Sequence, residues 1–267
     1  MQAQLTPENL VARINDYIAS GRTGPAKALL SALRRLAPGA PFVSEVAARL
    51  AIFQGDLQAA QMELDTALSS HPDDAALRRC RADVRHRLGD LIGAVQDAAE
   101  AVIAAANEPT GKAILGILMM ELGRTHDAVT CLREALAANP AVAAVREALA
   151  CALVAHGDPD AGATILGEGI TLTPDHAGLR NGAVLLACQR GRFEEALRLA
   201  EEARRCGHAN ACLFGLKARA LSALDRMDEA QEAYAEALKL GPAASLDHYA
   251  SLLRIKSGAG AESATTA

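Results

Sequence analysis

Small and apolar residues recur along the chain with a period of 34 residues. One column of this pattern holds glycine six times and aspartate once, at Gly21, Gly55, Gly89, Gly123, Gly157, Gly191 and Asp225. Small residues, mostly alanine, follow five positions after each of them and, except at Leu33, twelve positions after them, and proline commonly follows five positions later. The register holds from Pro7 to Ala244 without insertion or deletion, which makes seven units of 34 residues.

Within each unit, the pattern predicts two helices. Apolar residues occupy the third, sixth and tenth positions, and these steps of three and four place them on one helix face. The glycine column marks the reversal after the first helix, because glycine tolerates the left-handed conformation needed there. Small residues let the second helix approach its neighbours closely, and proline ends it. No unit can bury its apolar stripe alone, so neighbouring units are expected to stack.

These columns resemble the tetratricopeptide repeat family. The resemblance implies an all-α fold, a right-handed superhelical α-solenoid of helix-turn-helix units. The seven units span residues 7–40, 41–74, 75–108, 109–142, 143–176, 177–210 and 211–244. Residues 1–6 are then an N-terminal extension. Leu246, Tyr249, Leu252 and Leu253 share one face of a predicted C-terminal capping helix at 245–257, and residues 258–267 are expected to be a disordered tail.

Composition agrees with packed helices, since the chain is 51% hydrophobic, chiefly alanine, leucine and valine, but only 3% aromatic. The net charge of -5 gives no general attraction to nucleic acid. The abundance of alanine and arginine is typical of a bacterium with a GC-rich genome. We expect a cytoplasmic protein without membrane insertion, because no signal-peptide pattern and no apolar run of about 20 residues is found. The six cysteines form no CxxC pair, which favours thiols in a reducing compartment.

The stretch LRRCRADVRHRLGD, residues 77–90, is the most basic part of the chain. It is predicted to be the first helix of the third unit, and one basic helix does not make a nucleic-acid surface. Cys80 and His86 supply only two metal ligands, and Cys206, His208 and Cys212 lack a fourth, so no metal is expected. Arg81 and Arg85 occupy positions where the family packs apolar residues, and the sequence does not explain them.

A basic residue recurs at the fourth position of four successive units, namely Arg78, Lys112, Arg146 and Arg180. This basic ladder is either a row that contacts a partner or a solvated flank. The second interpretation is favoured, with pairing to acids of the preceding turns such as Asp73, Asp74, Glu108 and Asp175.

No catalytic motif or phosphate loop is present, so we expect no enzyme and no cofactor. The family resemblance implies a concave protein-binding groove. Its predicted residues are Phe42, Glu45, Arg49, Ile52, Phe53, Arg79, Asp83, His86, Arg87, Ile117, Met120, Glu121, Glu147, Cys151, Val154, Asn181, Leu185, Cys188, Gln189 and Arg219. This groove is expected to be basic near one end and apolar through the middle.

The expected partner is a protein or peptide with an apolar face and acidic residues. The first hypothesis is a non-catalytic scaffold or adaptor. The alternative is a repeat module that recruits substrates to a glycosyltransferase or methyltransferase, and a third option is self-association.

Overall fold

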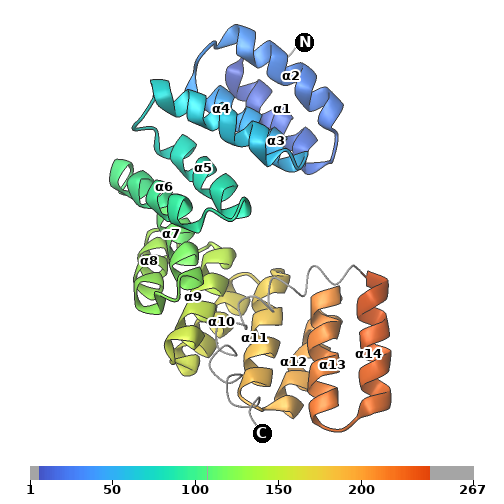
Figure 1. The fold of residues 1–267 in the computed structure, drawn as a ribbon. Coiled ribbons are helices and arrows are strands. Elements are labelled where there is room, and N and C mark those ends of the chain that lie inside the picture. The colour runs from blue at the N-terminus through green and yellow to red at the C-terminus, as the bar shows by residue number, and fades with distance from the viewer. Residues whose placement is uncertain (1–5, 107, 241–267) are drawn as a thin grey trace, which may run out of the picture. The chain divides into compact units, whose positions relative to one another are not determined.

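The computed structural model describes residues 6–106 and 108–240, and these residues form helices without any strand (Figure 1). The helices are α1 (Pro7–Ala19), α2 (Thr23–Leu36), α3 (Pro41–Phe53), α4 (Leu57–Ser70), α5 (Ala75–Arg87), α6 (Leu91–Ala104), α7 (Pro109–Glu121), α8 (Thr125–Ala138), α9 (Ala143–His156), α10 (Pro159–Leu172), α11 (Ala177–Gln189), α12 (Phe193–Arg205), α13 (Ala211–Ala223) and α14 (Met227–Leu240). The all-α prediction is confirmed. The predicted capping helix, the tail and nearly all of the N-terminal extension lie outside the described residues.

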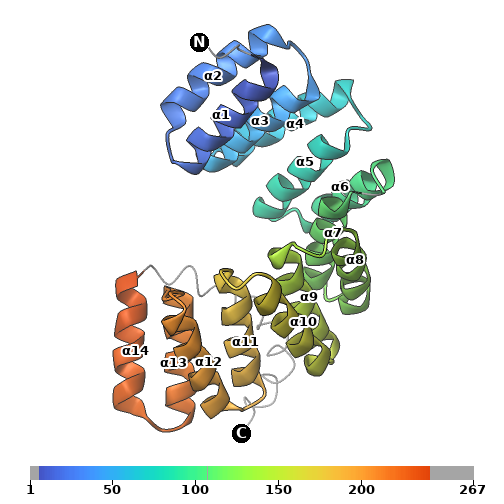
Figure 2. The same ribbon diagram turned by 180° about the vertical axis from the view of Figure 1, so that it is seen from behind.

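The chain divides into two compact units, of which the first ends at Leu118 and the second begins at Met119. In the first unit, α1 packs on α3 and α3 packs on α5. In the second unit, α9 packs on α11 and α11 packs on α13, while α12 lies against both α11 and α13. Figures 1 and 2 show α11 to α14 side by side from opposite directions. First helices therefore stack on first helices within each unit.

Each pair of helices is joined by the same tight turn, which ends the first helix in a left-handed residue. The glycine column has φ between 71° and 100°, and Asp225 takes its place with φ 60°. The amide of the left-handed residue donates to the carbonyl three residues back, and the next amide donates five residues back, as in Arg192 N to Ala187 O at 2.9 Å. These two bonds form the Schellman motif, and they recur at all seven positions of the column. The conformation expected from the glycines is confirmed.

The small-residue columns form the closest contacts between helices. Ala26, Ala60, Ala94, Ala128 and Ala196, at the first of these columns, are each fully buried. In the fifth repeat, Gly162 takes this place on α10, and a Cβ there would lie 3.1 Å from the carbonyl oxygen of Ala150 on α9. A larger side chain at this column would push the paired helices apart.

Arg81 and Arg85, unexplained by the sequence, are the partners of a buried carboxylate. Asp97 on α6 is 2% exposed and accepts from Arg81 through both oxygens, at 2.6 and 2.8 Å. Arg85 Nη1 lies 3.0 Å from Asp97 Oδ2, and Arg81 also donates to Asp65 at 2.8 Å. Hydrogen bonding to Asp97 raises the pKa of Arg81. The two arginines replace an apolar contact between α5 and α6 by an ion cluster.

Three arginines of the basic ladder pair with a glutamate on the second helix of the same repeat. The pairs are Arg78 with Glu100 at 3.1 Å, Arg146 with Glu168 at 3.2 Å and Arg180 with Glu202 at 3.8 Å. Only 8–16% of these arginine side chains is exposed, so the expectation of a solvated flank is wrong. At the preceding turns, Asp73 does approach Arg78, at 3.8 Å. Arg146 and Arg180 instead donate to the carbonyls of Pro140 and Pro174.

Replacement of glycine by alanine is expected to change the free energy of unfolding in opposite directions at a left-handed turn and within a helix. Gly191→Ala is expected to lower the free energy of unfolding by about 1 kcal/mol, because a Cβ disfavours φ 71°. Gly167→Ala, in the interior of α10, is expected to raise it by about 0.5–1 kcal/mol. Neither new methyl group would meet an atom within 4 Å, so the backbone alone decides the sign. Urea unfolding followed by circular dichroism measures both, and a destabilising Gly167→Ala would contradict this account.

The ion cluster predicts a large cost for removing its carboxylate. Asp97→Ala is expected to lower the free energy of unfolding by about 3 kcal/mol, because Arg81 and Arg85 lose a buried partner. The matched control is Asp83→Ala on α5, since Asp83 forms an exposed pair with Arg87 and its loss is expected to cost less than about 1 kcal/mol. Equal effects of the two substitutions in urea unfolding would show that the cluster is not stabilising.

Candidate functional site

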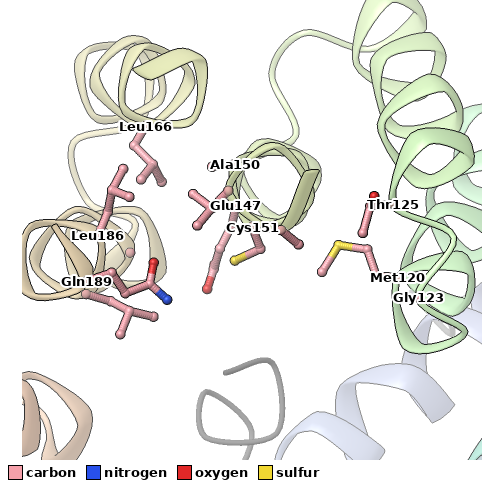
Figure 3. Close-up of a pocket in the computed structure, with 13 residues that line it drawn as sticks. Met120, Gly123, Thr125, Glu147, Ala150, Cys151, Leu166, Leu186 and Gln189 are labelled. Carbon is pink, nitrogen blue, oxygen red and sulfur yellow. The ribbon is translucent and has the colours of Figure 1, made fainter. Parts of the chain in front are cut away.

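The second compact unit contains a hollow of about 190 Å³. Its walls come from the end of α7 with the turn that follows it, and from α9, α10 and α11. Figure 3 shows Met120 on one side of the hollow and Leu186 and Gln189 on the other, with Cys151 and Glu147 between them. The site is therefore built on helices rather than on a long loop.

Small residues form part of the lining. Ala150 on α9 is 1% exposed and contributes a single methyl group to the lining. Gly182 on α11 has no side chain, and a Cβ there would lie 3.1 Å from Leu166 Cδ2 on α10. Glycine at 182 thus allows Leu166 of α10 to pack closely against α11. Apolar walls remain on the other sides, formed by Val154, Leu185 and the side chains named above.

The polar groups of the hollow are few, and only one is charged. Glu147 is the one lining residue with a charged side chain, and Gln189 adds an amide. Burial, and after it the negative charge of Glu147, raises the pKa of the Cys151 thiol to about 12. The same two causes raise the pKa of Cys212 to about 11. These thiols stay protonated at neutral pH, so the hollow offers no thiolate nucleophile.

Six of the predicted groove residues line this hollow together. They are Met120, Glu147, Cys151, Val154, Leu185 and Gln189. They come from three different first helices, α7, α9 and α11. The positions that they occupy within their repeats place them on one side of these helices. Their role in binding stays a prediction. Sequence reasoning missed the small residues Ala150 and Gly182, which also line the hollow, and Leu166, which reaches the hollow from the second helix α10.

Other predicted groove residues have different surroundings. Phe42, Phe53 and Ile117 are exposed by 37%, 48% and 39%, while Ile52 is half-buried. Cys188 is buried, at 3% exposure, and its thiol donates to the carbonyl oxygen of Leu216 at 3.9 Å. Glu121 and Arg219 are exposed, and His86 is half-buried. The exposed aromatic residues are the ones available to a partner, whereas Cys188 belongs to the core.

Two predicted groove residues at the fifth position bind the last residue of their own repeat, which caps the first helix of the next repeat. Arg79 pairs with Glu108, and Asn181 donates to Asn210 Oδ1 at 3.3 Å; in both cases the partners lie 29 residues apart. Glu108 and Asn210 in turn accept from backbone amides at the start of α7 and α13. Against the effect of partial burial, hydrogen bonds from Thr110 and Arg79 hold the pKa of Glu108 below its usual value. These side chains hold neighbouring helices together.

The expected basic end of the groove is compensated by carboxylates. Arg49 lies 3.3 Å from Glu45, Arg87 lies 3.0 Å from Asp83, and Arg79 is paired with Glu108. A positive charge that already has an acidic neighbour attracts an acidic partner less strongly. The charges of the first unit therefore give weak support to the expectation of an acidic partner.

Neither a metal centre nor a membrane span is evident in the part of the chain that the structure describes. No three side chains of His, Cys, Asp or Glu come together there in an arrangement suited to a metal ion. His208, one of the considered ligands, lies with Nε2 3.1 Å from the carbonyl oxygen of Pro174. None of the helices has both the length and the apolar character that crossing a bilayer requires.

Comparison with known proteins identifies the repeat. A family model described as tetratricopeptide repeat matches residues 46–109 and 147–211, and a second model of the same description matches residues 213–243. Together they match more than half of the chain. No curated protein sequence matches.

Solved structures show the same fold at low sequence identity. A tetratricopeptide repeat protein from Parabacteroides merdae is 22% identical, with a TM-score of 0.70, over 94% of this chain and 98% of its own. PilW, a type IV pilus biogenesis factor, is 15% identical, with a TM-score of 0.67, over 80% of this chain and 97% of its own. A chain of the Cut9–Hcn1 hetero-tetramer of the APC/C is 12% identical, with a TM-score of 0.71, over 86% of this chain and 45% of its own.

The raised thiol pKa values predict which cysteines react slowly. At pH 8, a thiol with a pKa of about 12 is ionised to only ~0.01%, so Cys151 is expected to be alkylated by iodoacetamide far more slowly than the exposed Cys206. Peptide mass spectrometry after timed labelling of the folded protein measures both rates. In denaturant, both cysteines should react alike, and alkylation of native Cys151 as fast as Cys206 would refute the assignment.

Proposed function

Because this chain belongs to the tetratricopeptide repeat family, whose fold generally mediates protein–protein interaction, we propose that it is a scaffold or adaptor that binds a segment of a partner protein. The bound segment is a peptide or a helix, and it lies on the side of the first helices where the hollow opens. The observation that carries this proposal is the hollow itself, an apolar concavity formed jointly by the end of α7 and by α9, α10 and α11.

The nature of the hollow supports binding. Concave sites lined mainly by apolar side chains, with a few polar groups, are typical of recognition surfaces. Val154, Leu185 and Met120 supply the apolar lining, and Gln189 and Glu147 supply polar groups that orient an occupant. The side chains are held by helix packing, so little conformational entropy is lost when a partner binds.

The exposed aromatic residues of α3 supply a second contact in the first compact unit. Phe42 and Phe53 are 37% and 48% exposed, although large apolar residues of a folded domain are usually buried. Exposed apolar surface of this kind commonly marks an interaction site. We expect these side chains to form a contact surface of the first unit that is separate from the hollow.

The chemistry of the hollow favours binding over catalysis. Its one carboxylate, Glu147, has no second acid or base among the lining residues with which to share a proton transfer. The thiol of Cys151 is protonated, since its pKa is raised to about 12. The lining is therefore suited to holding an apolar group and poorly suited to activating one.

Filling the hollow tests the proposal. Cys151→Phe places a ring in the space and is expected to reduce partner capture at least about tenfold, the effect of losing about 1.4 kcal/mol of binding free energy. Partners are captured on the full-length chain from a lysate of the source cells, identified by mass spectrometry and placed by chemical cross-linking. The matched control is Cys206→Phe, which adds the same ring at an exposed position outside the hollow.

Cross-links from the captured partner should fall on residues around the hollow and around Phe42 and Phe53. Circular dichroism must show that both variants keep the helical content of the original chain. Undiminished capture by Cys151→Phe, with no cross-link near the hollow, would place partner binding elsewhere and overturn the proposed function.

A further inference from the structure

We infer that the hollow between α9, α10 and α11 receives one aromatic side chain of the partner, and that a positively charged group of the partner lies beside it. This inference rests on the proposed function and specifies the chemistry of the bound segment. Three properties of the hollow carry it, namely its size, its sulfur atoms and the sign of its charge.

The size of the hollow suits a single ring. Its volume is about 190 Å³. In other proteins, a dry apolar cavity of roughly 150 Å³ accepts benzene. An aromatic side chain offers a large apolar area at a low entropic cost, because it has only two rotatable side-chain bonds. The lining around this volume is mainly apolar, with Val154, Leu185 and Leu186 among its side chains.

Two sulfur atoms line the hollow and favour an aromatic occupant. Figure 3 shows the thioether of Met120 and the thiol of Cys151 facing the same space. Polarizable sulfur makes favourable contacts with the edges and faces of aromatic rings. Met120 is 5% exposed, so its position is set by packing. An aliphatic occupant would gain less from these two atoms than a ring.

The charge at the hollow is negative. Glu147 is the one charged residue in the lining, and after burial its charge is what raises the pKa of both Cys151 and Cys212. A carboxylate of the partner would be repelled there and would lose water in the process, whereas an ammonium or guanidinium group would be attracted. The acidic partner expected from the sequence is therefore disfavoured at this part of the surface.

The positions of Glu147 and Gln189 also indicate which groups the bound segment carries. Glu147 belongs to the first turns of α9, and its carboxylate lies so close to α11 that a Cβ at Gly178 would collide with it. The amide of Gln189, at the other end of α11, can donate to a backbone carbonyl of the bound segment. A segment with a lysine or arginine next to tryptophan, tyrosine or phenylalanine satisfies these requirements.

Two small probes with the same ring and opposite charge test the inference directly. Tryptamine and indole-3-propionate share an indole with a two-carbon chain, which ends in an ammonium group in the first and in a carboxylate in the second. Each is titrated into the full-length protein labelled with ¹³C at its methionine methyl groups, and the shift of the Met120 resonance gives the dissociation constant. At low ionic strength, tryptamine is expected to bind about tenfold more tightly, with millimolar affinity for so small a ligand.

Variants separate the ring from the charge. Glu147→Gln is expected to bring the two probes within about twofold of each other while both still shift Met120, because the ring site is intact. Cys151→Phe is expected to abolish both shifts. The matched control is Glu232→Gln on α14, which makes the same change of charge outside the hollow and should leave the preference for tryptamine unchanged. Circular dichroism verifies that each variant is folded.

The possible outcomes decide between occupants and between proposals. Equal binding of the two probes, tighter binding of indole-3-propionate, or no shift of Met120 with either probe overturns the inference. A more than tenfold gain in probe affinity in full-length Tyr249→Ala overturns it in favour of the chain's own C-terminal segment as occupant. If a captured partner cross-links at the hollow without an aromatic residue beside a cation, the inference fails and the proposed function stands. If the probes behave as expected but Cys151→Phe still captures its partner, the proposed function fails and the site's chemistry stands.

Discussion

The constraint on which the structure depends is the reversal of the chain at one left-handed residue in every 34. Each reversal closes the same two hydrogen bonds, so every first helix ends in the same way and delivers the chain to its second helix at the same angle. Because the turns are equal, the same columns meet in successive repeats. The column alanines are then buried in successive repeats, ladder arginines meet glutamates, and three first helices present one side to a common hollow.

The elements of the fold could be predicted because their requirements are local. A glycine is needed where φ is positive, and a small residue is needed where two helices touch, so both leave a column in the sequence. Ion partners leave no such mark. Arg81 and Arg85 are explained only by Asp97, which comes from the other helix of the repeat and occurs once. The ladder arginines also reach to the second helix, since a long side chain has several acids within its radius.

The sequence predicts several of the side chains that line the candidate site, but it does not predict the size or shape of the hollow. Six of the predicted groove residues line one space, because position within a repeat fixes the direction of a side chain. The form of that space depends on the close contact between Gly182 and Leu166, which comes from the second helix α10 and not from a first helix. Arg79 and Asn181, both at the fifth position, are engaged by Glu108 and Asn210, the last residues of their own repeats. Position within the repeat alone does not distinguish a side chain that is accessible to a partner from one that joins two helices.

Leu166 and Leu186 belong both to the wall of the hollow and to the hydrophobic core between α10 and α11. In the proposed binding mode, recognition and folding therefore share the same atoms. Whatever occupies the hollow contacts these leucines only while α10 and α11 are packed, so its binding energy is added to the free energy that opposes their local opening. Helix α10 contributes little of its own surface to an occupant, yet its stability becomes a function of occupancy. In this binding mode, the stability of the packing between α10 and α11 depends on whether the hollow is occupied.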